Sequence, residues 1–266
     1  MVQSGEASGV GISGTAKVSR RSFGLGLAAF AAGCSAQADL TEGEHGRIAR
    51  ITDGDVLGLD TGLKVRLAEI EAPAPGYDGR PDEPFAPEAS DTLKAAALGR
   101  QARLWYGGLS RDGYERALAH VIAMDETGSD VWLNALMIKQ GAARVRTWPD
   151  NSRRADKLLT LEAEARAARR GLWTLDHWRI RQLDDLAEPP YFAIVEGRVT
   201  EVSRIPGDGE AHLSANGIHF KIGERLGAGD IGLTANAQIR VRGRIDTRDG
   251  GQKIRVTHWA QVEAAG

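Results

Sequence analysis

The sequence is poor in cysteine: its 266 residues include only Cys34. One thiol cannot close an internal disulfide or build a zinc site from several thiolates, so both of those frameworks are excluded. A surplus of charge is also missing, because 34 lysines and arginines face 36 aspartates and glutamates, for a formal net charge of -2. Proteins that coat nucleic acid by bulk electrostatics are basic, so any phosphate binding here must be local.

Apolar runs long enough for a permanent membrane anchor are not evident either. The run at 23–32 is about half of the roughly 20 residues that a spanning helix needs. It follows a Gly- and Ser-rich start and the pair Arg20-Arg21, which is the layout of a secretory signal. Residues 19–25 resemble the twin-arginine export motif of bacteria. We therefore expect an export signal and linker at 1–38, and an exported bacterial protein.

Two cleavage sites compete at the end of this signal. The segment 31–35 resembles a bacterial lipoprotein box, in which Cys34 becomes the acylated N-terminus, and this interpretation is favoured. Ala36-Gln37-Ala38 instead fits ordinary signal cleavage. Cys34 as a small apolar residue of the signal is the third possibility. The expected location is the periplasm or, through a lipid on Cys34 alone, the membrane surface of the cell envelope.

The pattern from residue 45 onward predicts a mixed α and β fold. Alternating apolar and polar residues predict strands at 46–51, 56–59, 63–70, 102–106 and 117–124. Helices are predicted at 87–99, 131–140 and 152–170, from apolar spacing, from Pro87 in a first turn and from Gly141 at an end. Five strands with an inserted helix predict a five-stranded OB-type barrel with three helices.

Short motifs within the same region occur in a recognisable order. They are Thr52-Asp53-Gly54-Asp55, Val65-Arg66-Leu67, Glu71-Ala72-Pro73, Pro87-Glu88-Ala89-Ser90, the run from Arg111 to Ala119, Asn134-Ala135-Leu136, Gln140-Gly141 and Gly171-Leu172-Trp173. In this order they resemble the thermonuclease family. The resemblance implies an OB-fold domain at 45–178 that hydrolyses nucleic-acid phosphodiesters with calcium.

The resemblance also implies a metal site. Asp55 matches the first carboxylate ligand of calcium, and Glu71 matches the second, where an aspartate is more typical. Ala72 would contribute its backbone carbonyl. Carboxylate and carbonyl oxygens suit a hard cation such as Ca²⁺.

Phosphate contacts are implied in the same way. Arg66 and Arg116 match two phosphate-clamping arginines, whose planar forks can bond two oxygens and stay charged at any working pH. Tyr114 matches a hydroxyl that contacts phosphate. Trp148 lies in a loop where family members carry base-stacking aromatics, and an indole can stack on a base. The implied partner is single-stranded nucleic acid or another phosphate-bearing ligand.

Each of these residues also has a purely structural interpretation. An isolated Asp53-Gly54-Asp55 is more often a turn than a metal loop. Arg66 alone could be a solvated strand residue, Arg116 an ion-pair partner of Asp112 or Glu115, and Trp148 a cover over Pro149. It is their combination in family order that favours a site.

One position departs from the family pattern. After Asp-x-Pro the family places a glutamate that orients or activates the attacking water, and here that position is Ala74. A methyl group cannot accept a proton, and general-base help is typically worth about 10² to 10⁴ in rate. The carboxylate of Asp78, returned by a loop stiffened by prolines, is a weaker alternative source. The sequence therefore allows a slow phosphodiesterase, an inactive envelope module that binds a polyanion in the same arginine pocket, or a structural partner-binding protein.

The C-terminal part predicts a second, smaller β structure. Alternation predicts strands at 195–202, 211–215, 218–222, 238–245 and 252–257, with a hairpin turn at Asn216-Gly217. We expect an OB-like β domain at 191–266 after a charged connector. Ile239, Val241 and Ile245 should face inward, which leaves an outward row of Arg240, Arg242 and Arg244 beside Arg255. That row either binds phosphate or, as the favoured interpretation, keeps a half-exposed strand soluble.

Overall fold

The computed structural model describes residues 39–125, 127–182, 191–204, 211–215, 218–222, 234–246 and 253–265. They belong to one compact unit, Gly33–Gly266. The export signal predicted at 1–38, with Cys34, lies outside the described residues, and the predicted domain limits stay predictions. None of the helices within the described ranges combines the length and apolar character that crossing a membrane requires.

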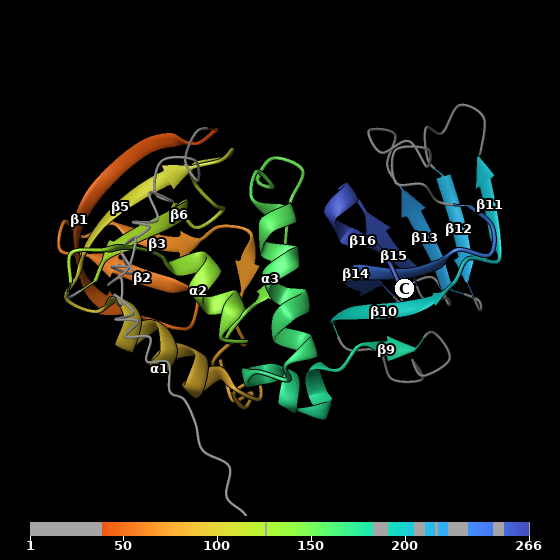
Figure 1. Ribbon diagram of the computed structural model, residues 1–266, viewed down its shortest axis with the longest axis horizontal. Helices are drawn as coiled ribbons and strands as arrows, with labels where there is room; N and C mark the ends of the chain where they lie inside the picture. The colour runs from red at the N-terminus through yellow and green to blue at the C-terminus, as the bar shows by residue number, and fades with distance from the viewer. Residues whose placement is uncertain are drawn as a thin grey trace, which may run out of the picture. The chain divides into compact units, whose positions relative to one another are not determined.

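The first part of the chain is a closed five-stranded β-barrel (Figure 1). Its strands are β1 (Thr41–Ile51), β2 (Val56–Leu59), β3 (Lys64–Leu67), β5 (Gln101–Tyr106) and β6 (Ala117–Met124). Antiparallel pairs run in the order β3-β2-β1-β5-β6, and a parallel pairing of β3 with β6 closes the ring. The OB-type barrel predicted from the alternation is therefore confirmed.

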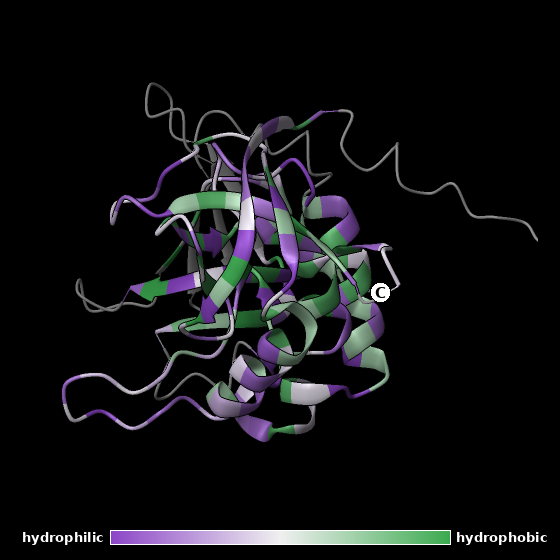
Figure 2. Ribbon diagram, turned by 90° about the vertical axis from the view of Figure 1, so that its left-hand side faces the viewer, coloured by the Kyte–Doolittle hydropathy of each residue, from purple (hydrophilic) through white to green (hydrophobic). Residues whose placement is uncertain are grey.

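Alternation places the barrel's apolar side chains inward. In β3, Val65 and Leu67 are fully buried, whereas Lys64 is exposed and Arg66 is half-buried. Successive side chains of a strand point to opposite faces, so burying Val65 and Leu67 turns Arg66 to the outer face. Figure 2 shows hydrophobic and hydrophilic residues alternating along strands of the barrel.

Three helices accompany the barrel, as predicted: α1 (Ala86–Ala97), α2 (Leu133–Lys139) and α3 (Ala155–Ala167). Helix α2 starts two residues later than predicted, because Val131 and Trp132 pair with β6 as part of β7 (Asp130–Trp132). The predicted strand 63–70 is also divided. Glu69 has a left-handed φ of 64°, after which β4 (Ile70–Glu71) pairs with β8 (Arg144–Val145).

The C-terminal part forms a second sheet. Its strands are β9 (Arg181–Gln182), β10 (Phe192–Arg198), β11 (Glu201–Arg204), β12 (Ala211–Ala215), β13 (Ile218–Ile222), β14 (Gln238–Asp246), β15 (Lys253–Val256) and β16 (Val262–Ala264). The order is β11-β12-β13-β15-β14-β10, with β13 and β15 parallel. Only Val199 and Thr200 separate β10 from β11, so the two can be counted as one long strand. Counted in this way, the strands of the sheet follow the same order along the chain as those of the first barrel. The predicted turn Asn216-Gly217 lies outside the described residues.

One expectation for β14 is wrong. Ile239, Val241 and Ile245 are buried as expected, but Arg242 is only 1% exposed rather than part of a wet outer row. Its guanidinium donates to both carboxylate oxygens of Glu162 on α3, at 3.1 and 2.7 Å, and to Glu263 on β16. The outer face of β14 at Arg242 is covered by α3, so the arginine is part of an interior ion network.

Candidate functional site

A tight loop between β1 and β2 carries the first acidic residue of the site. Asp53 Oδ1 accepts a hydrogen bond from the Asp55 backbone N at 3.1 Å, as the turn interpretation predicted. A Cβ at Gly54 would lie 2.6 Å from Ala72 Cβ and 2.8 Å from Ala89 Cβ. Only glycine therefore lets this loop pack so closely against α1 and the chain after β4, which fixes Asp55 beside Ala72.

Arg66 links the two acidic residues that the sequence placed in one cluster. Its Nη2 atom lies 3.4 Å from Asp55 Oδ2 and 4.0 Å from Glu71 Oε1. Asp55 Oδ2 also accepts a hydrogen bond from Ala72 N at 3.3 Å. Arg66 is thus not an ordinary solvated strand residue, and Asp55, Glu71 and Ala72 do converge.

Burial sets the ionisation of Asp55. It raises the pKa of Asp55 to about 7; the Arg66 guanidinium opposes the shift and the neighbouring Asp53 adds to it. One half-buried arginine therefore does not fully offset the cost of burying this charge. A further cation beside Asp55 would supply the positive charge needed to stabilise the ionised carboxylate.

Glu71 is in a different electrostatic position. Its carboxylate accepts a hydrogen bond from Arg144 Nη2 at 2.9 Å and another from Arg146. Burial by itself would raise the pKa of Glu71, but Arg144, Arg146 and Arg66 outweigh it and hold the pKa below its ordinary value. Glu71 is therefore an ionised carboxylate whose charge is already balanced by guanidinium groups.

Arg116 is held by the turn that precedes β6. Its Nε and Nη2 atoms contact Asp112 Oδ2 at 2.7 and 2.6 Å, so the predicted alternative pairing with Asp112 is present. Asp112 Oδ1 also accepts hydrogen bonds from the backbone N atoms of Tyr114 and Arg116. The Tyr114 ring lies 5.1 Å from Arg116 Cζ and is 83% exposed. The turn thus presents a fixed arginine beside an accessible phenol.

Arg66 and Arg116 line one pocket of about 340 Å³. Tyr114, Arg146 and Trp148 are on its wall as well. Trp148 is 49% exposed, with its ring 5.1 Å from Arg146 Cζ. The structure therefore brings four of the predicted residues to a common cavity: Arg66, Arg116, Tyr114 and Trp148. Asp55 and Glu71 are not among the residues that line it, but both contact Arg66.

The oxygen donors fit a hard cation on the Asp55 side. Asp55 is a buried carboxylate short of positive charge, the adjacent Ala72 has a carbonyl, and Glu71 approaches the same Arg66 atom. No group of three or more His, Cys, Asp or Glu residues with metal-ligand spacing occurs in the described part of the chain. A cation here would hence depend on two carboxylates, a backbone oxygen and water.

Comparison with known proteins decides the family. A family model described as staphylococcal nuclease homologue matches residues 64–175. An Escherichia coli protein named uncharacterized endonuclease is 33% identical over 134 residues, which are 49% of this chain and 77% of that protein. The chain belongs to the staphylococcal nuclease family. The thermonuclease of Staphylococcus intermedius, another staphylococcal nuclease relative, is 28% identical over 134 residues, covering the same two shares.

Ala74, where the family pattern has a glutamate, is exposed and lies in a loop that Glu83 contacts. Ala74 N donates to Glu83 Oε2 at 2.8 Å, and Glu83 N donates to Ala74 O at 2.9 Å. Glu83 therefore holds the loop in shape, although neither residue is among those that line the pocket of Arg66 and Arg116. Asp78, the weaker alternative source of a carboxylate, has no described contact with this pocket.

Arg144 and Arg146 are the site residues that sequence reasoning did not assign to Glu71. They lie 73 and 75 residues from it along the chain and reach it because β8 pairs with β4. The signal available in the sequence was the alternation Arg144-Val145-Arg146, three residues after Gly141. Val145 faces the core, so both arginines face the opposite side.

Proposed function

We propose that this member of the staphylococcal nuclease family is a phosphodiesterase that hydrolyses nucleic acid slowly in the presence of calcium. The observation that carries the proposal is the shared pocket of Arg66 and Arg116, with Asp55 and Glu71 joined to Arg66. Relatives named endonuclease and thermonuclease support a nuclease reaction.

The two arginines would act on the phosphate itself. Phosphodiester hydrolysis requires the negative charge on the phosphoryl oxygens to be balanced as the attacking oxygen bonds to phosphorus and the leaving oxygen departs. Arg66 and Arg116 bind and orient those oxygens, and the accessible Tyr114 hydroxyl adds a hydrogen bond. Because the two guanidinium groups are held by Asp55 and by Asp112, they are pre-organised for this task.

Calcium would be held by Asp55, Glu71 and the Ala72 carbonyl. When bound, it supplies additional positive charge against the phosphoryl oxygens. Asp55 gains the cation that its burial demands, whereas Glu71 offers little net charge because Arg144 and Arg146 already neutralise it. We expect weak binding, on the order of the 10⁻⁴ to 10⁻³ M seen in extracellular calcium modules.

The water-activating group is the missing component. Ala74 offers no proton acceptor, and the carboxylate of Glu83 is engaged by the Ala74 backbone N. Without general-base help the rate falls by about 10² to 10⁴, which is why the proposed enzyme is slow. Export through the signal at 1–38, with the lipid on Cys34, is part of the same proposal and places the activity in the cell envelope.

A second candidate function follows from Ala74. The same arginine pocket would hold a phosphorylated or polyanionic envelope ligand without cutting it. Binding without turnover requires only the guanidinium groups and the exposed aromatics, all of which are present.

Cleavage by the purified full chain separates the two functions. The enzyme is incubated in excess over single-stranded DNA with millimolar calcium, beside an Arg66→Ala, Arg116→Ala double variant. Arg103→Ala is the matched control, since Arg103 pairs with Asp130 on the surface and does not line the pocket. Calcium-dependent cleavage lost only in the double variant supports the nuclease. Cleavage retained by the double variant would show that the site is wrong, and binding without any cleavage favours the second function.

A further inference from the structure

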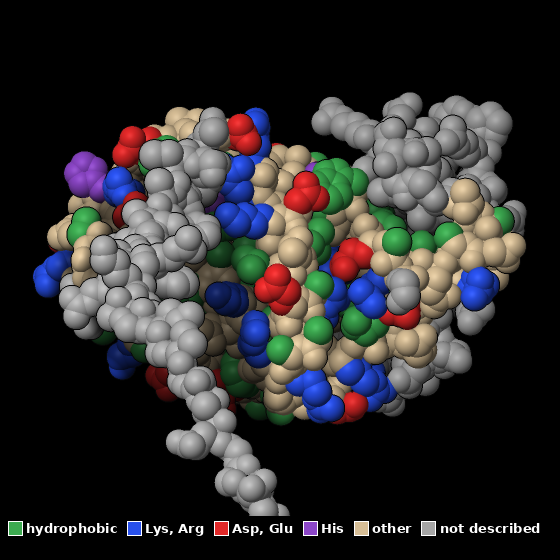
Figure 3. Space-filling view, in the orientation of Figure 1, with side chains coloured by type: hydrophobic (Ala, Val, Ile, Leu, Met, Phe, Trp, Pro, Cys, Tyr) green, Lys and Arg blue, Asp and Glu red, His purple; other side chains and the backbone are tan. Residues whose placement is uncertain are grey.

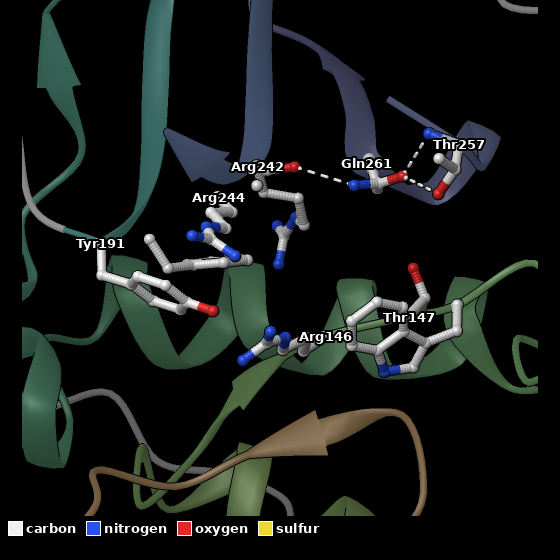
Figure 4. Close-up of a pocket in the computed structure, with 10 residues that line it drawn as sticks. Arg146, Thr147, Tyr191, Arg242, Arg244, Thr257 and Gln261 are labelled. Atoms are coloured by element: carbon white, nitrogen blue, oxygen red, sulfur yellow. Dashed lines mark hydrogen bonds between the residues drawn. The ribbon is translucent and has the colours of Figure 1, made fainter. Parts of the chain in front are cut away.

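A second cleft adjoins the arginine pocket. It has a volume of about 250 Å³ and lies between the chain after β8 and the C-terminal sheet. Arg146 and Thr147 lie on one side, and Arg244 and Thr257 lie on the other (Figure 4). Trp148 and Tyr191 line the cleft as well. Arg146 and Trp148 also line the pocket of Arg66 and Arg116, so the two cavities share a wall.

The charge of this cleft is positive. Arg146, Arg242 and Arg244 contribute guanidinium groups, and among the described residues no carboxylate lines it. Arg242 is neutralised by Glu162 and Glu263, and Arg146 pairs with Glu71. Arg244 is different: it is exposed, its Cζ lies 4.6 Å from the Tyr191 ring, and it has no acidic partner among the residues that the structure describes. An unpaired guanidinium facing a cavity favours an anion there.

Two accessible aromatic rings line the cleft. Tyr191 is 61% exposed and Trp148 is 49% exposed. Exposed aromatics interleaved with arginines are the arrangement that binds single-stranded nucleic acid, because bases stack on the rings and phosphates pair with the guanidinium groups. Figure 3 shows basic side chains interspersed with acidic ones where α3 and the C-terminal sheet meet.

We propose that the cleft between Trp148 and Arg244 is a nucleotide-binding subsite supplied by the C-terminal sheet. It takes a phosphate on Arg244 and a base against Tyr191 or Trp148, from the strand that continues beyond the phosphate held by Arg66 and Arg116. The inference rests on the proposed function for the position of that first phosphate. It gives the second module a task in substrate length selection.

Binding of short and long oligonucleotides tests the subsite. The full chain is titrated without calcium, to prevent turnover, against a fluorescent single strand of about 12 nucleotides and against a dinucleotide competitor. Arg244→Ala should raise the Kd of the long strand about 5- to 10-fold and lower the slope of log Kd against log salt by about 0.7, the loss of one phosphate contact. The affinity for the dinucleotide should stay unchanged, because it fills only the Arg66 pocket.

Arg198→Ala is the matched control. Arg198 is an exposed arginine of the same module that donates to Asn236 O and does not line the cleft. A salt slope and Kd for Arg244→Ala equal to those of this control would overturn the subsite, as would equal losses for both substrate lengths. Chain cleavage is scored separately. If the wild type cleaves DNA and Arg244→Ala binds both substrates as the wild type does, the subsite is refuted and the nuclease function is not. If Arg244→Ala weakens binding of the long strand alone and the wild type does not cleave DNA, the nuclease function is refuted and the subsite is not.

Discussion

Single residues determine how much chemistry the site can do. Asp55 and Glu71 are both acidic and both near Arg66, yet their surroundings differ, because one is short of positive charge and the other has three guanidinium partners. Arg66 and Arg116 are each held by a carboxylate, so they are oriented before any ligand arrives. In the proposed function, the carboxylate for water activation is the component that Ala74 does not supply.

Restoring that carboxylate should restore rate. Ala74 is exposed, so a longer side chain fits without disturbing the core. Ala74→Glu is expected to raise kcat for single-stranded DNA by about 10² or more, since a positioned base is worth about 10² to 10⁴. Ala74→Gln, which has the same shape but cannot take a proton at working pH, is the control. A glutamate variant no faster than the glutamine variant would show that water activation is not what limits this protein.

The arginines on Glu71 should weaken calcium binding. Removing one of them leaves more negative charge for a cation, and a charge a few ångströms away is worth roughly 1 to 4 kcal/mol at ε between 80 and 20. Arg146→Ala is therefore expected to tighten calcium binding about tenfold or more, measured by isothermal titration calorimetry without nucleic acid. Arg103→Ala should leave the affinity unchanged. Weaker calcium binding in Arg146→Ala would contradict the assigned role of Glu71.

At the scale of elements, pairings between distant segments bring the site together. β4 and β8 are only two residues each, but their register puts Arg144 opposite Glu71. The parallel pairing of β3 with β6 sets Arg66 opposite Leu118, so the arginine on β3 and the turn that ends at Arg116 face the same pocket. Helix α3 carries the buried Glu162 that meets Arg242 of β14.

The ion network of Arg242 should stabilise the packing of strands β14 and β16 against helix α3. Arg242 and Glu162 are both almost fully buried, so removing the arginine leaves the buried Glu162 with the more distant Arg166, at 3.6 Å, as its described cationic partner. Arg242→Ala is expected to lower the free energy of unfolding by about 3 to 5 kcal/mol, measured by urea denaturation followed by tryptophan fluorescence. Arg198→Ala, on the surface of the same module, should change it by about 0.5 kcal/mol or less. Equal stability of the two variants would mean that the network is not formed in solution.

At the scale of the whole molecule, two structures with the same strand connections follow one another in the chain. Alternation in the sequence was sufficient to predict the strands of both sheets, because each strand has one buried face, as in Val65 and Leu67 of β3, whereas the OB-like domain at 191–266 stays a prediction. The family motifs likewise predicted that Arg66, Arg116, Asp55 and Glu71 would converge. These features depend on local pattern and on order along the chain.

The remaining features depend on tertiary contacts that no local pattern contains. Val131 and Trp132 have a helix-like spacing with α2 but become strand because the edge of β6 is available to them. Arg242 stands at a position where the alternation predicts a solvent-exposed side chain, but helix α3 covers it. Arg146 is an unremarkable surface arginine in the sequence, and only the fold shows that it contacts Glu71 and separates two cavities.

Hydrolysis of single-stranded DNA in calcium should depend on Arg66, so the decisive measurement compares its rate in the full chain with the rate in Arg66→Ala. Arg66 contacts Asp55 and Glu71 and also lines the pocket that it shares with Arg116. Losing one donor to a developing charge typically costs about 10² to 10³ in kcat. We expect a fall in kcat/KM of at least that size, with Arg103→Ala unaffected. Equal values of kcat/KM for Arg66→Ala and the unmodified chain would contradict it.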